Sequence, residues 1–120
     1  MKICIVAGAR PNFVKIAPIL RALESSIARV DKSRCRLVHT GQHYDHGMSD
    51  SFFEDLGIRE PDVNLQCASG SQAEATGAIM IAFEQELAAN PADLVLVVGD
   101  VNSTLACSVV AKKMGCQLAH

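Results

Sequence analysis

Short apolar runs alternate along this chain with longer segments in which apolar residues recur every three or four positions. Residues 3–7 form the first run, which is continuously apolar and ends at Gly8. Such a run is typical of a strand that is covered on both faces. Further strands are expected at 36–40, 62–65 and 94–98, the last of which consists of five aliphatic residues.

A helix is expected after the first strand, because apolar residues recur there at helical spacing. These residues are Ile16, Leu20, Leu23 and Ile27. Pro11 suits a first helical turn, whereas Pro18 would kink or end a helix that contains it. The helix is therefore expected either to begin near Pro11 and bend at Pro18 or to begin at Pro18.

A second helix is predicted before Gly57, a residue that is well placed to end it. Its apolar stripe consists of Met48, Phe52, Phe53 and Leu56. Ser71 and Glu74 match a capping box that opens a third helix, which Pro91 bounds at its far end. The apolar face of that helix includes Ile79, Phe83 and Leu87.

A fourth helix and a fifth strand are expected after the strand at 94–98. The apolar stripe of this helix consists of Leu105, Val109, Val110 and Met114. Lys112 and Lys113 fall in its last turn and Gly115 lies just beyond, as at many helix C-termini. Residues 117–120 then look like the opening of a fifth strand.

Strands that alternate with single helices imply right-handed crossovers and therefore a parallel, doubly wound α/β sheet. The chain has 120 residues, the size of one ordinary domain. A sheet that stops inside its fifth strand, with no helix to follow, suggests the N-terminal piece of a longer protein.

The composition narrows the class of protein. Hydrophobic residues make up 49% of the chain, which is enough to fill a core and argues against disorder. A formal net charge of -2 without a basic run argues against a nucleic-acid partner. No apolar stretch approaches the ~20 residues that span a bilayer. The five cysteines lack CxxC spacing, so we interpret them as reduced thiols of a cytosolic protein.

In an open parallel sheet, ligands bind beyond the carboxyl ends of the strands, where the strand order reverses. Three loops are expected at this edge, formed by residues 8–12, 41–43 and 99–104. If the first and fourth strands are neighbours, Arg10 and Asp100 would face each other across the crevice. The first loop lacks the GxGxxG dinucleotide pattern, and the chain has no GxxxxGK[ST] phosphate loop.

Two cations near the first loop are candidate ligands of an anion. Arg10 lies at the N-terminal edge of a helix, where a guanidinium and the helix dipole together favour phosphate. Lys15 would reach the same anion if the helix begins at Pro11. The alternative is an ordinary surface residue: position alone leaves both interpretations open for Arg10 and favours the exposed helical lysine for Lys15.

Asp100 is a candidate for chemistry because it follows a buried strand and precedes a polar helix start. Its alternative role is a helix N-cap or a turn aspartate. Asn102 and Ser103 can cap that helix themselves, which favours function for Asp100.

The second loop carries Gln42 and His43, which suit donors to a phosphate or a sugar. His39 lies within the second strand and is interpreted as structural. No metal site is expected, because no carboxylate partners His39 and His43 at ligand spacing.

Three segments at these loops carry a specific resemblance. They read Gly-Ala-Arg-Pro-Asn-Phe-Val-Lys-Ile-Ala-Pro at 8–18, Thr-Gly-Gln-His-Tyr at 40–44 and Val-Gly-Asp-Val-Asn-Ser-Thr at 98–104. In this order and spacing they closely resemble the non-hydrolysing UDP-N-acetylglucosamine 2-epimerases of bacteria. Residues 51–58 and 119–120 are also similar to that family. Many members have Arg-Pro-Glu-Ala where this chain has Arg-Pro-Asn-Phe, which we interpret as a subfamily variant.

The resemblance implies a GT-B architecture, in which two Rossmann-like domains enclose the active site. Residues 1–120 would form most of the first domain, and the second domain would be absent from this chain. In the family the final Ala-His pair leads into a Val-Glu-Ala-Gly stretch that holds a further catalytic candidate. The chain is therefore expected to be inactive alone.

The implied reaction interconverts UDP-N-acetylglucosamine and UDP-N-acetylmannosamine by anti elimination and re-addition of UDP, without a cofactor. By the family pattern Asp100 is the acid/base candidate, and Arg10 and Lys15 bind substrate. Gln42 and His43 match positions linked in some members to a second, allosteric UDP-N-acetylglucosamine. The full-length protein is expected to be a cytoplasmic homodimer that serves surface polysaccharide synthesis.

Two other interpretations stay open. The chain is also compatible with half of a GT-B glycosyltransferase, or of a hydrolysing epimerase that releases free N-acetylmannosamine. The third possibility is a sugar-nucleotide-binding module without turnover. The sequence that follows His120 would discriminate among these functions.

Overall fold

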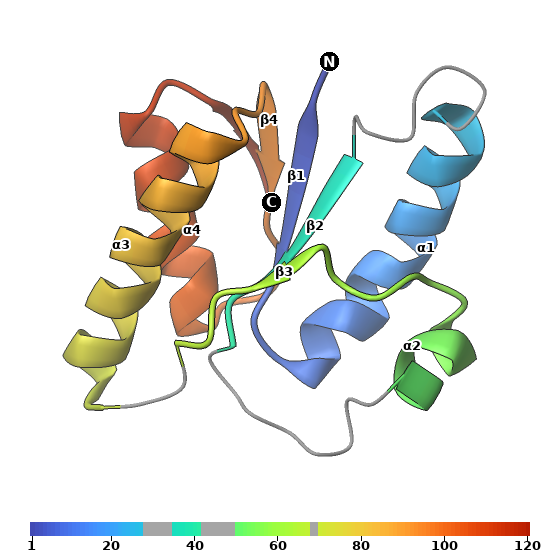
Figure 1. The fold of residues 1–120 in the computed structure, drawn as a ribbon, viewed down its shortest axis with the longest axis horizontal. Helices are drawn as coiled ribbons and strands as arrows, with labels where there is room; N and C mark the ends of the chain where they lie inside the picture. The colour runs from blue at the N-terminus through green and yellow to red at the C-terminus, as the bar shows by residue number, and fades with distance from the viewer. Residues whose placement is uncertain (28–34, 42–49, 68–69) are drawn as a thin grey trace.

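A five-stranded parallel sheet forms the centre of the computed structural model of this chain (Figure 1). The structure describes residues 1–27, 35–41, 50–67 and 70–120. In chain order the elements are β1 (Ile3–Ala7), α1 (Arg10–Ile27), β2 (Cys35–His39), α2 (Asp50–Leu56), β3 (Val63–Asn64), α3 (Gln72–Ala89), β4 (Leu94–Leu96), α4 (Asn102–Lys113) and β5 (Gln117–Ala119).

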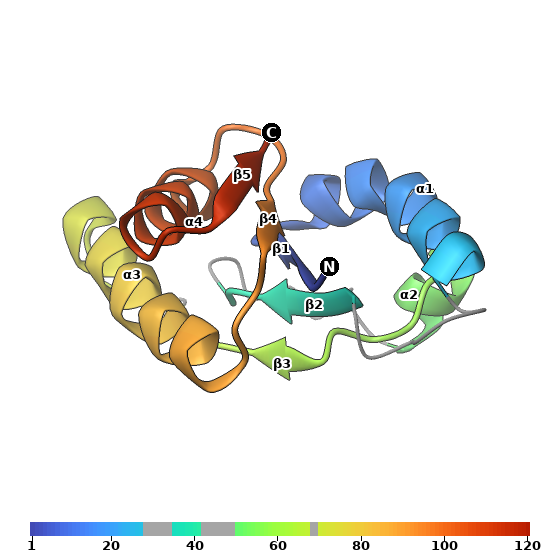
Figure 2. The ribbon, with the colours of Figure 1, turned by 90° about the horizontal axis from the view of Figure 1, so that it is seen from above.

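Helices cover both faces of the sheet. Figure 2 shows α1 and α2 on one side of the strands and α3 and α4 on the other. All five residues of β1 are buried, and they alternate between the two cores. Ile5 packs with Phe13 of α1, whereas Cys4 and Val6 pack with Phe83 of α3. The predicted doubly wound parallel sheet is confirmed, and its continuous apolar first strand reflects burial on both faces.

The strand order is β3-β2-β1-β4-β5, and every neighbouring pair is parallel. The chain moves outward from β1 to β2 and β3, and then returns to the other side of β1 to form β4 and β5. The order therefore reverses between β1 and β4. This confirms that the first and fourth strands are neighbours and places the switch point between them.

The strands begin and end within two residues of the predicted positions. The second strand is shifted to Cys35–His39, and the third is shortened to Val63–Asn64. The fourth ends at Leu96, although the Val97 amide still donates to the Ala119 carbonyl at 2.9 Å. Apolar runs predicted these strands well, whereas pairing with the neighbouring strand decided where each one ends.

Helix α1 begins at Arg10 and continues through Pro18 as one helix. This agrees with the first of the two predicted starts and rules out the second. Pro18 is exposed, whereas Ile16 and Leu20 on either side of it are buried against the sheet. Burial of this apolar face offsets the backbone hydrogen bond that the proline cannot donate.

The predicted C-terminal end of α2 and the predicted N-terminal start of α3 are confirmed. Gly57 ends α2 with a φ of +72°, and its amide donates to the Glu54 carbonyl at 2.9 Å. Ser71 and Glu74 form the predicted capping box, with both hydrogen bonds at 3.2 Å. Met48, which was assigned to the stripe of α2, lies outside the described residues.

The predicted apolar stripe of α4 is wrong for two of its residues. Leu105 is 60% exposed and Met114 is 40% exposed. The buried face instead carries Ser103, Ala106, Cys107, Val110 and Ala111. Helix α4 packs against both α3 and the sheet, and small side chains allow this close approach. The bulkier residues therefore lie on the outer side.

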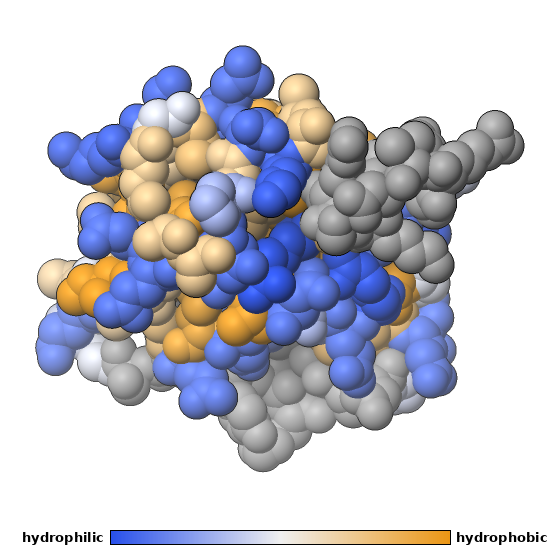
Figure 3. Space-filling view, turned by 45° about the horizontal axis from the view of Figure 1, so that its top comes forward, coloured by the Kyte–Doolittle hydropathy of each residue, from blue (hydrophilic) through white to orange (hydrophobic). Residues whose placement is uncertain are grey.

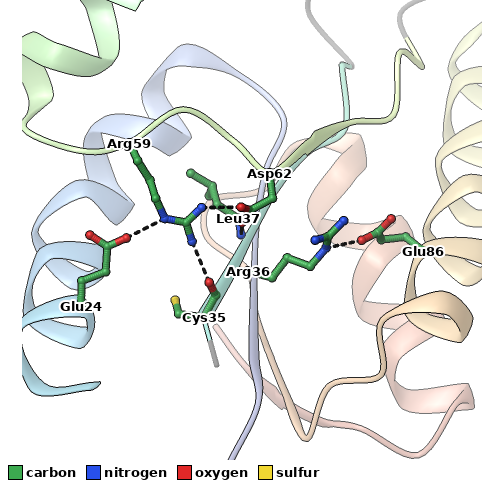
Figure 4. A network of polar contacts seen from close by, with 7 residues as sticks. All are labelled: Glu24, Cys35, Arg36, Leu37, Arg59, Asp62 and Glu86. Carbon is green, nitrogen blue, oxygen red and sulfur yellow. Dashed lines mark hydrogen bonds and ion pairs between the residues drawn. The ribbon is translucent and has the colours of Figure 1, made fainter. Parts of the chain in front are cut away.

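Two arginines tie β2 to its surroundings (Figure 4). Arg59 contacts Glu24 of α1 at 2.8 Å and Asp62 at 2.6 Å, and it donates to the Cys35 carbonyl at 2.6 Å. Arg36 extends to the other face of the sheet and contacts Glu86 of α3 at 2.5 Å. These ion pairs link β2 and the segment before β3 to a helix on each face of the sheet.

The surface is mixed in polarity, and the cysteines are free thiols. On the face shown in Figure 3, hydrophilic residues lie between the hydrophobic ones. Within the described part of the chain, no helix is both long and apolar enough to cross a membrane. All five cysteines are free thiols, and burial raises the pKa of Cys4 to about 12.

The exposed position of Leu105 generates a test of the α4 packing. We expect Leu105→Ala to change the free energy of unfolding by no more than about 0.5 kcal/mol, as for a surface substitution. Val110→Ala removes two buried methylene-sized groups and should cost about 1.5 kcal/mol. Urea unfolding of both variants measures the difference. An equal loss in both variants would contradict the observed orientation of α4.

Candidate active site

The carboxyl ends of the strands bring several loops to one edge of the sheet. Arg10 opens α1 three residues after the last residue of β1, and Asp100 lies in the connection between β4 and α4. Because β1 and β4 are parallel neighbours, these two connections emerge side by side. The predicted location of Arg10 and Asp100 at the same edge is confirmed.

Asn12 holds the first of these connections in place. Its Oδ1 accepts hydrogen bonds from the backbone amides of Gly8 at 2.9 Å and Ala9 at 3.1 Å. Asn12 is buried, and only 3% of the residue is exposed. Asn12 is the third residue of α1, the position from which a capping box reaches back to the helix start. The sequence pattern predicted no role for Asn12, although its place two residues after the helix start was the available signal.

A buried hydrogen bond joins the residue that follows β2 to the first turn of α4. Thr40 Oγ1 lies 2.6 Å from Ser103 Oγ, beneath the first connection. A Cβ on Gly8 would lie 2.7 Å from Ser103 Cβ and 3.0 Å from Thr40 Oγ1. Gly8 is therefore required because its neighbours leave no room for a side chain. Three loops that are far apart in sequence meet at this point.

The β4–α4 connection is held from two sides. Gly99 has a φ of +73°, which favours glycine, and its carbonyl accepts a hydrogen bond from His120 Nε2 at 2.7 Å. On the side toward α1, a Cβ on Gly99 would lie 3.1 Å from Asn12 Nδ2 and 3.9 Å from Lys15 Nζ. Asp100, which follows Gly99, is exposed to solvent.

The two candidate cations approach this edge from different directions. The Arg10 guanidinium lies over the ring of Phe52 in α2, with Cζ 4.6 Å from the ring centroid. Lys15 lies one turn further along α1, and its ammonium group comes close to Gly99. Lys15 is thus one cation that the structure brings to the loop that carries Asp100. The start of α1 at Arg10 satisfies the condition under which Lys15 was predicted to reach the site.

The alternative role of Asp100 as a helix cap is not observed. The N-cap of α4 is Val101, and no side chain caps the helix through a hydrogen bond. Asn102, another predicted cap, donates instead to Gln72 Oε1 at 2.5 Å. The N-cap residue itself therefore supplies no side-chain cap, and the first turn of α4 begins two residues after Asp100. An N-terminus of this kind favours negative charge on a ligand.

His39 is structural, as expected. Its Nδ1 accepts a hydrogen bond from the Gly41 amide at 3.1 Å, and its ring lies edge-on to Phe13 at 5.1 Å. Burial lowers the pKa of His39, and a hydrogen bond to the Ala7 backbone opposes that shift to a smaller extent. A neutral imidazole therefore supports the end of β2. Gln42 and His43, the candidates that follow it, lie outside the described residues.

Metal-binding clusters and ionised thiols are the other kinds of reactive group that could be expected in a site. No group of three histidine, cysteine or acidic residues comes together within residues 1–27, 35–41, 50–67 and 70–120 to hold a metal ion. Burial raises the pKa of Cys4, Cys67 and Cys107, so these thiols stay protonated. The arrangement offers two cations and one exposed carboxylate, a set suited to a phosphorylated substrate and proton transfer.

Comparison with known proteins identifies the family. The sequence model of one family, described as UDP-N-acetylglucosamine 2-epimerase, matches residues 25–120. The chain belongs to this family. The UDP-N-acetylglucosamine 2-epimerase of Methanocaldococcus jannaschii is 40% identical over 120 residues. The UDP-2,3-diacetamido-2,3-dideoxy-D-glucuronate 2-epimerase of Pseudomonas aeruginosa is 38% identical over 122 residues. Both matches cover 100% of this chain.

The fold agrees with solved structures of the same family. The crystal structure of the M. jannaschii UDP-GlcNAc 2-epimerase, in complex with UDP-GlcNAc and UDP, superposes with a TM-score of 0.89 and 39% identity. That match covers 100% of this chain and 32% of the solved one. The chain likewise spans 31% of the M. jannaschii sequence and 33% of the P. aeruginosa sequence. It therefore corresponds to about a third of these relatives.

The burial of His39 generates a pH-dependent prediction. Its folded-state pKa lies below the ordinary 6.5, so the unfolded chain binds a proton before the folded chain does as the pH falls. Folding should therefore lose stability as the pH drops below 6.5. His39→Asn keeps an acceptor for the Gly41 amide and removes this titration. The difference in unfolding free energy between the two proteins should shift in favour of the variant on acidification, whereas a constant difference would refute the assignment.

Proposed function

We propose that this chain forms one wall of the active site of a non-hydrolysing UDP-N-acetylglucosamine 2-epimerase. The observation that carries the proposal is the meeting of the β1–α1 and β4–α4 connections at the switch point, with Lys15 beside the loop of Asp100. Family membership and the similarity to an epimerase bound to UDP-GlcNAc and UDP support the same substrate class. The product would be UDP-N-acetylmannosamine.

The domain organisation follows from this assignment. Residues 1–120 would form most of the first Rossmann-like domain of a GT-B enzyme, and a second domain would supply the opposite wall. The chain spans about a third of its relatives, 31% in the case of the M. jannaschii protein. A cleft between two domains would exclude water from the substrate and strengthen the electrostatic interactions inside it.

The proposed reaction has to remove a proton from C2 of the sugar, which no adjacent carbonyl acidifies. Departure of UDP from C1 develops positive charge on the sugar ring and makes the C2 proton more acidic. Anti elimination then yields 2-acetamidoglucal and UDP. UDP adds back to C1 while a proton arrives at the other face of C2. No electrons are gained or lost overall, so the path needs acid/base groups and cations but no redox cofactor.

The residues of this chain suit these steps. Asp100 would exchange a proton with the sugar as the acid/base group. Lys15 and Arg10 would bind the diphosphate and stabilise the charge that develops on departing UDP. The N-terminal end of α4, which follows Asp100 closely, would add its helix dipole to the same electrostatic field. Gln42 and His43 would contribute donors to the bound sugar nucleotide, either at the active site or at an allosteric position.

The similarity to the P. aeruginosa protein favours a second substrate. That relative is named as a 2-epimerase of a UDP-diacetamido-glucuronate and is 38% identical, close to the 40% of the M. jannaschii protein. Both names describe inversion at C2 of a UDP-linked sugar. Comparing turnover of the two UDP-sugars would decide between a neutral and an acidic sugar ring.

The cellular setting is part of the proposal. The free thiols are consistent with a reducing compartment, so we place the enzyme in the cytoplasm. We further propose that it acts as a homodimer and feeds the synthesis of surface polysaccharides. Sedimentation of the complete protein would measure the number of subunits.

Asp100 and Arg10 generate distinct kinetic predictions, which can be measured in a chimaera. Residues 1–120 would replace the matching third of the M. jannaschii enzyme. Asp100→Asn keeps the size of the side chain but removes proton transfer, so kcat should fall by roughly 10²–10⁴-fold with little change in melting temperature. Arg10→Ala removes a cation from the diphosphate, so KM should rise and kcat should fall.

The measurement pairs exchange of the C2 proton with deuterated solvent and thermal melting of the same samples. Wild-type exchange rates in Asp100→Asn would exclude Asp100 as the base. A low melting temperature with normal activity per folded molecule would instead assign Asp100 a structural role.

The isolated chain should not turn over substrate. Residues 1–120 alone lack the proposed opposite wall, so we expect no measurable epimerisation of UDP-N-acetylglucosamine. The chimaera is the matched control, assayed at the same concentration by following UDP-N-acetylmannosamine. Turnover by the isolated chain at a rate comparable with the chimaera would show that the site is complete within these residues.

A further inference from the structure

Asn12 is a polar side chain in a position that otherwise belongs to the core. It is the residue between exposed Pro11 and fully buried Phe13 in the first turn of α1, and only 3% of it is exposed. Burying a carboxamide is unfavourable unless its polar atoms are satisfied. Its Oδ1 meets this requirement by accepting from the Gly8 and Ala9 amides. These two amides belong to the residues directly before Arg10. The same bonds therefore determine where α1 begins and hold the backbone that leads into Arg10.

The other end of the carboxamide faces the β4–α4 connection. Asn12 Nδ2 lies 3.1 Å from the position that a Cβ on Gly99 would occupy. Gly99 cannot retreat freely, because its carbonyl is held by His120 at 2.7 Å. The Asn12 side chain therefore fills the space between the β1–α1 connection and the residue that precedes Asp100.

The geometry points to Asn12 as a positioning residue: its carboxamide oxygen fixes the two residues before Arg10, and its side chain separates them from the loop that carries Asp100. This role rests on the proposed function, in which Arg10 binds the diphosphate and Asp100 is the acid/base group. Asn12 itself needs no contact with substrate. What matters is an oxygen that accepts both backbone amides, so a carboxylate can replace the carboxamide, whereas an apolar side chain of similar size cannot.

Two substitutions in the chimaera separate these properties. Asn12→Asp keeps the accepting oxygen, and charge-assisted bonds to the same amides should hold kcat within about threefold of wild type. Asn12→Leu keeps much of the volume but removes the acceptor and leaves two amides unpaired. Displacement of the Arg10 loop should then lower kcat by about 10- to 100-fold. An equal loss in both variants, or wild-type kcat in Asn12→Leu, would overturn the proposal.

Loss of stability alone is controlled by Val110→Ala, a buried substitution in α4 that is remote from Asn12 in sequence. It should lower the melting temperature and leave kcat per folded molecule unchanged. If Asn12→Leu loses no more activity per folded molecule than Val110→Ala, Asn12 is only structural and the proposal is wrong.

A readout without activity separates this inference from the proposed function. Hydrogen exchange of the Gly8 and Ala9 amides in the 120-residue chain should stay slow in wild type and Asn12→Asp and become at least about tenfold faster in Asn12→Leu. Unchanged exchange in Asn12→Leu would overturn the positioning role even if the chimaera is active. The expected exchange pattern together with a chimaera that does not epimerise would instead refute the proposed function and leave the role of Asn12 in the loop standing.

Discussion

Burial of β1 on both faces and pairing along both of its edges is the constraint on which the rest of this structure depends. A strand in this position must be apolar throughout, and residues 3–7 are. It also forces the chain to build the sheet outward in two directions, because β2 and β4 occupy its two edges. The reversal of strand order beside β1 follows from this arrangement, and so does the location of the candidate site at its carboxyl end.

The loops at that end are joined by polar contacts in a region that is otherwise apolar. The Thr40 and Ser103 hydroxyls form a hydrogen bond next to Gly8, and Asn12 Oδ1 accepts from the Gly8 and Ala9 amides. Buried polar groups that satisfy one another accept few alternative geometries. An apolar contact of the same size would tolerate sliding of one loop past another. These bonds therefore give the exposed charges at this edge a rigid support, which the proposed proton transfer and diphosphate binding would require.

Features that depend only on residues close together in the sequence could be predicted at their observed positions. The capping box of Ser71 and Glu74 spans three residues, and Gly57 ends its helix through a backbone conformation that glycine adopts readily. The predicted apolar stripe of α4 was wrong for two residues because periodicity does not show how close a helix lies to its neighbours. Leu105 faces outward since small residues are needed where α4 meets α3 and the sheet.

The sequence by itself determined the parallel α/β fold, the family through its loop motifs, and the edge at which Arg10 and Asp100 lie. Only the tertiary structure decided how these loops are supported. It turned Arg10 onto Phe52, brought Lys15 to Gly99 and buried Asn12 between the two connections. The physical reason is separation along the chain: Thr40 and Ser103 are 63 residues apart. Their contact exists only because the packed sheet holds β1, β2 and β4 in register, and no local pattern encodes that distance.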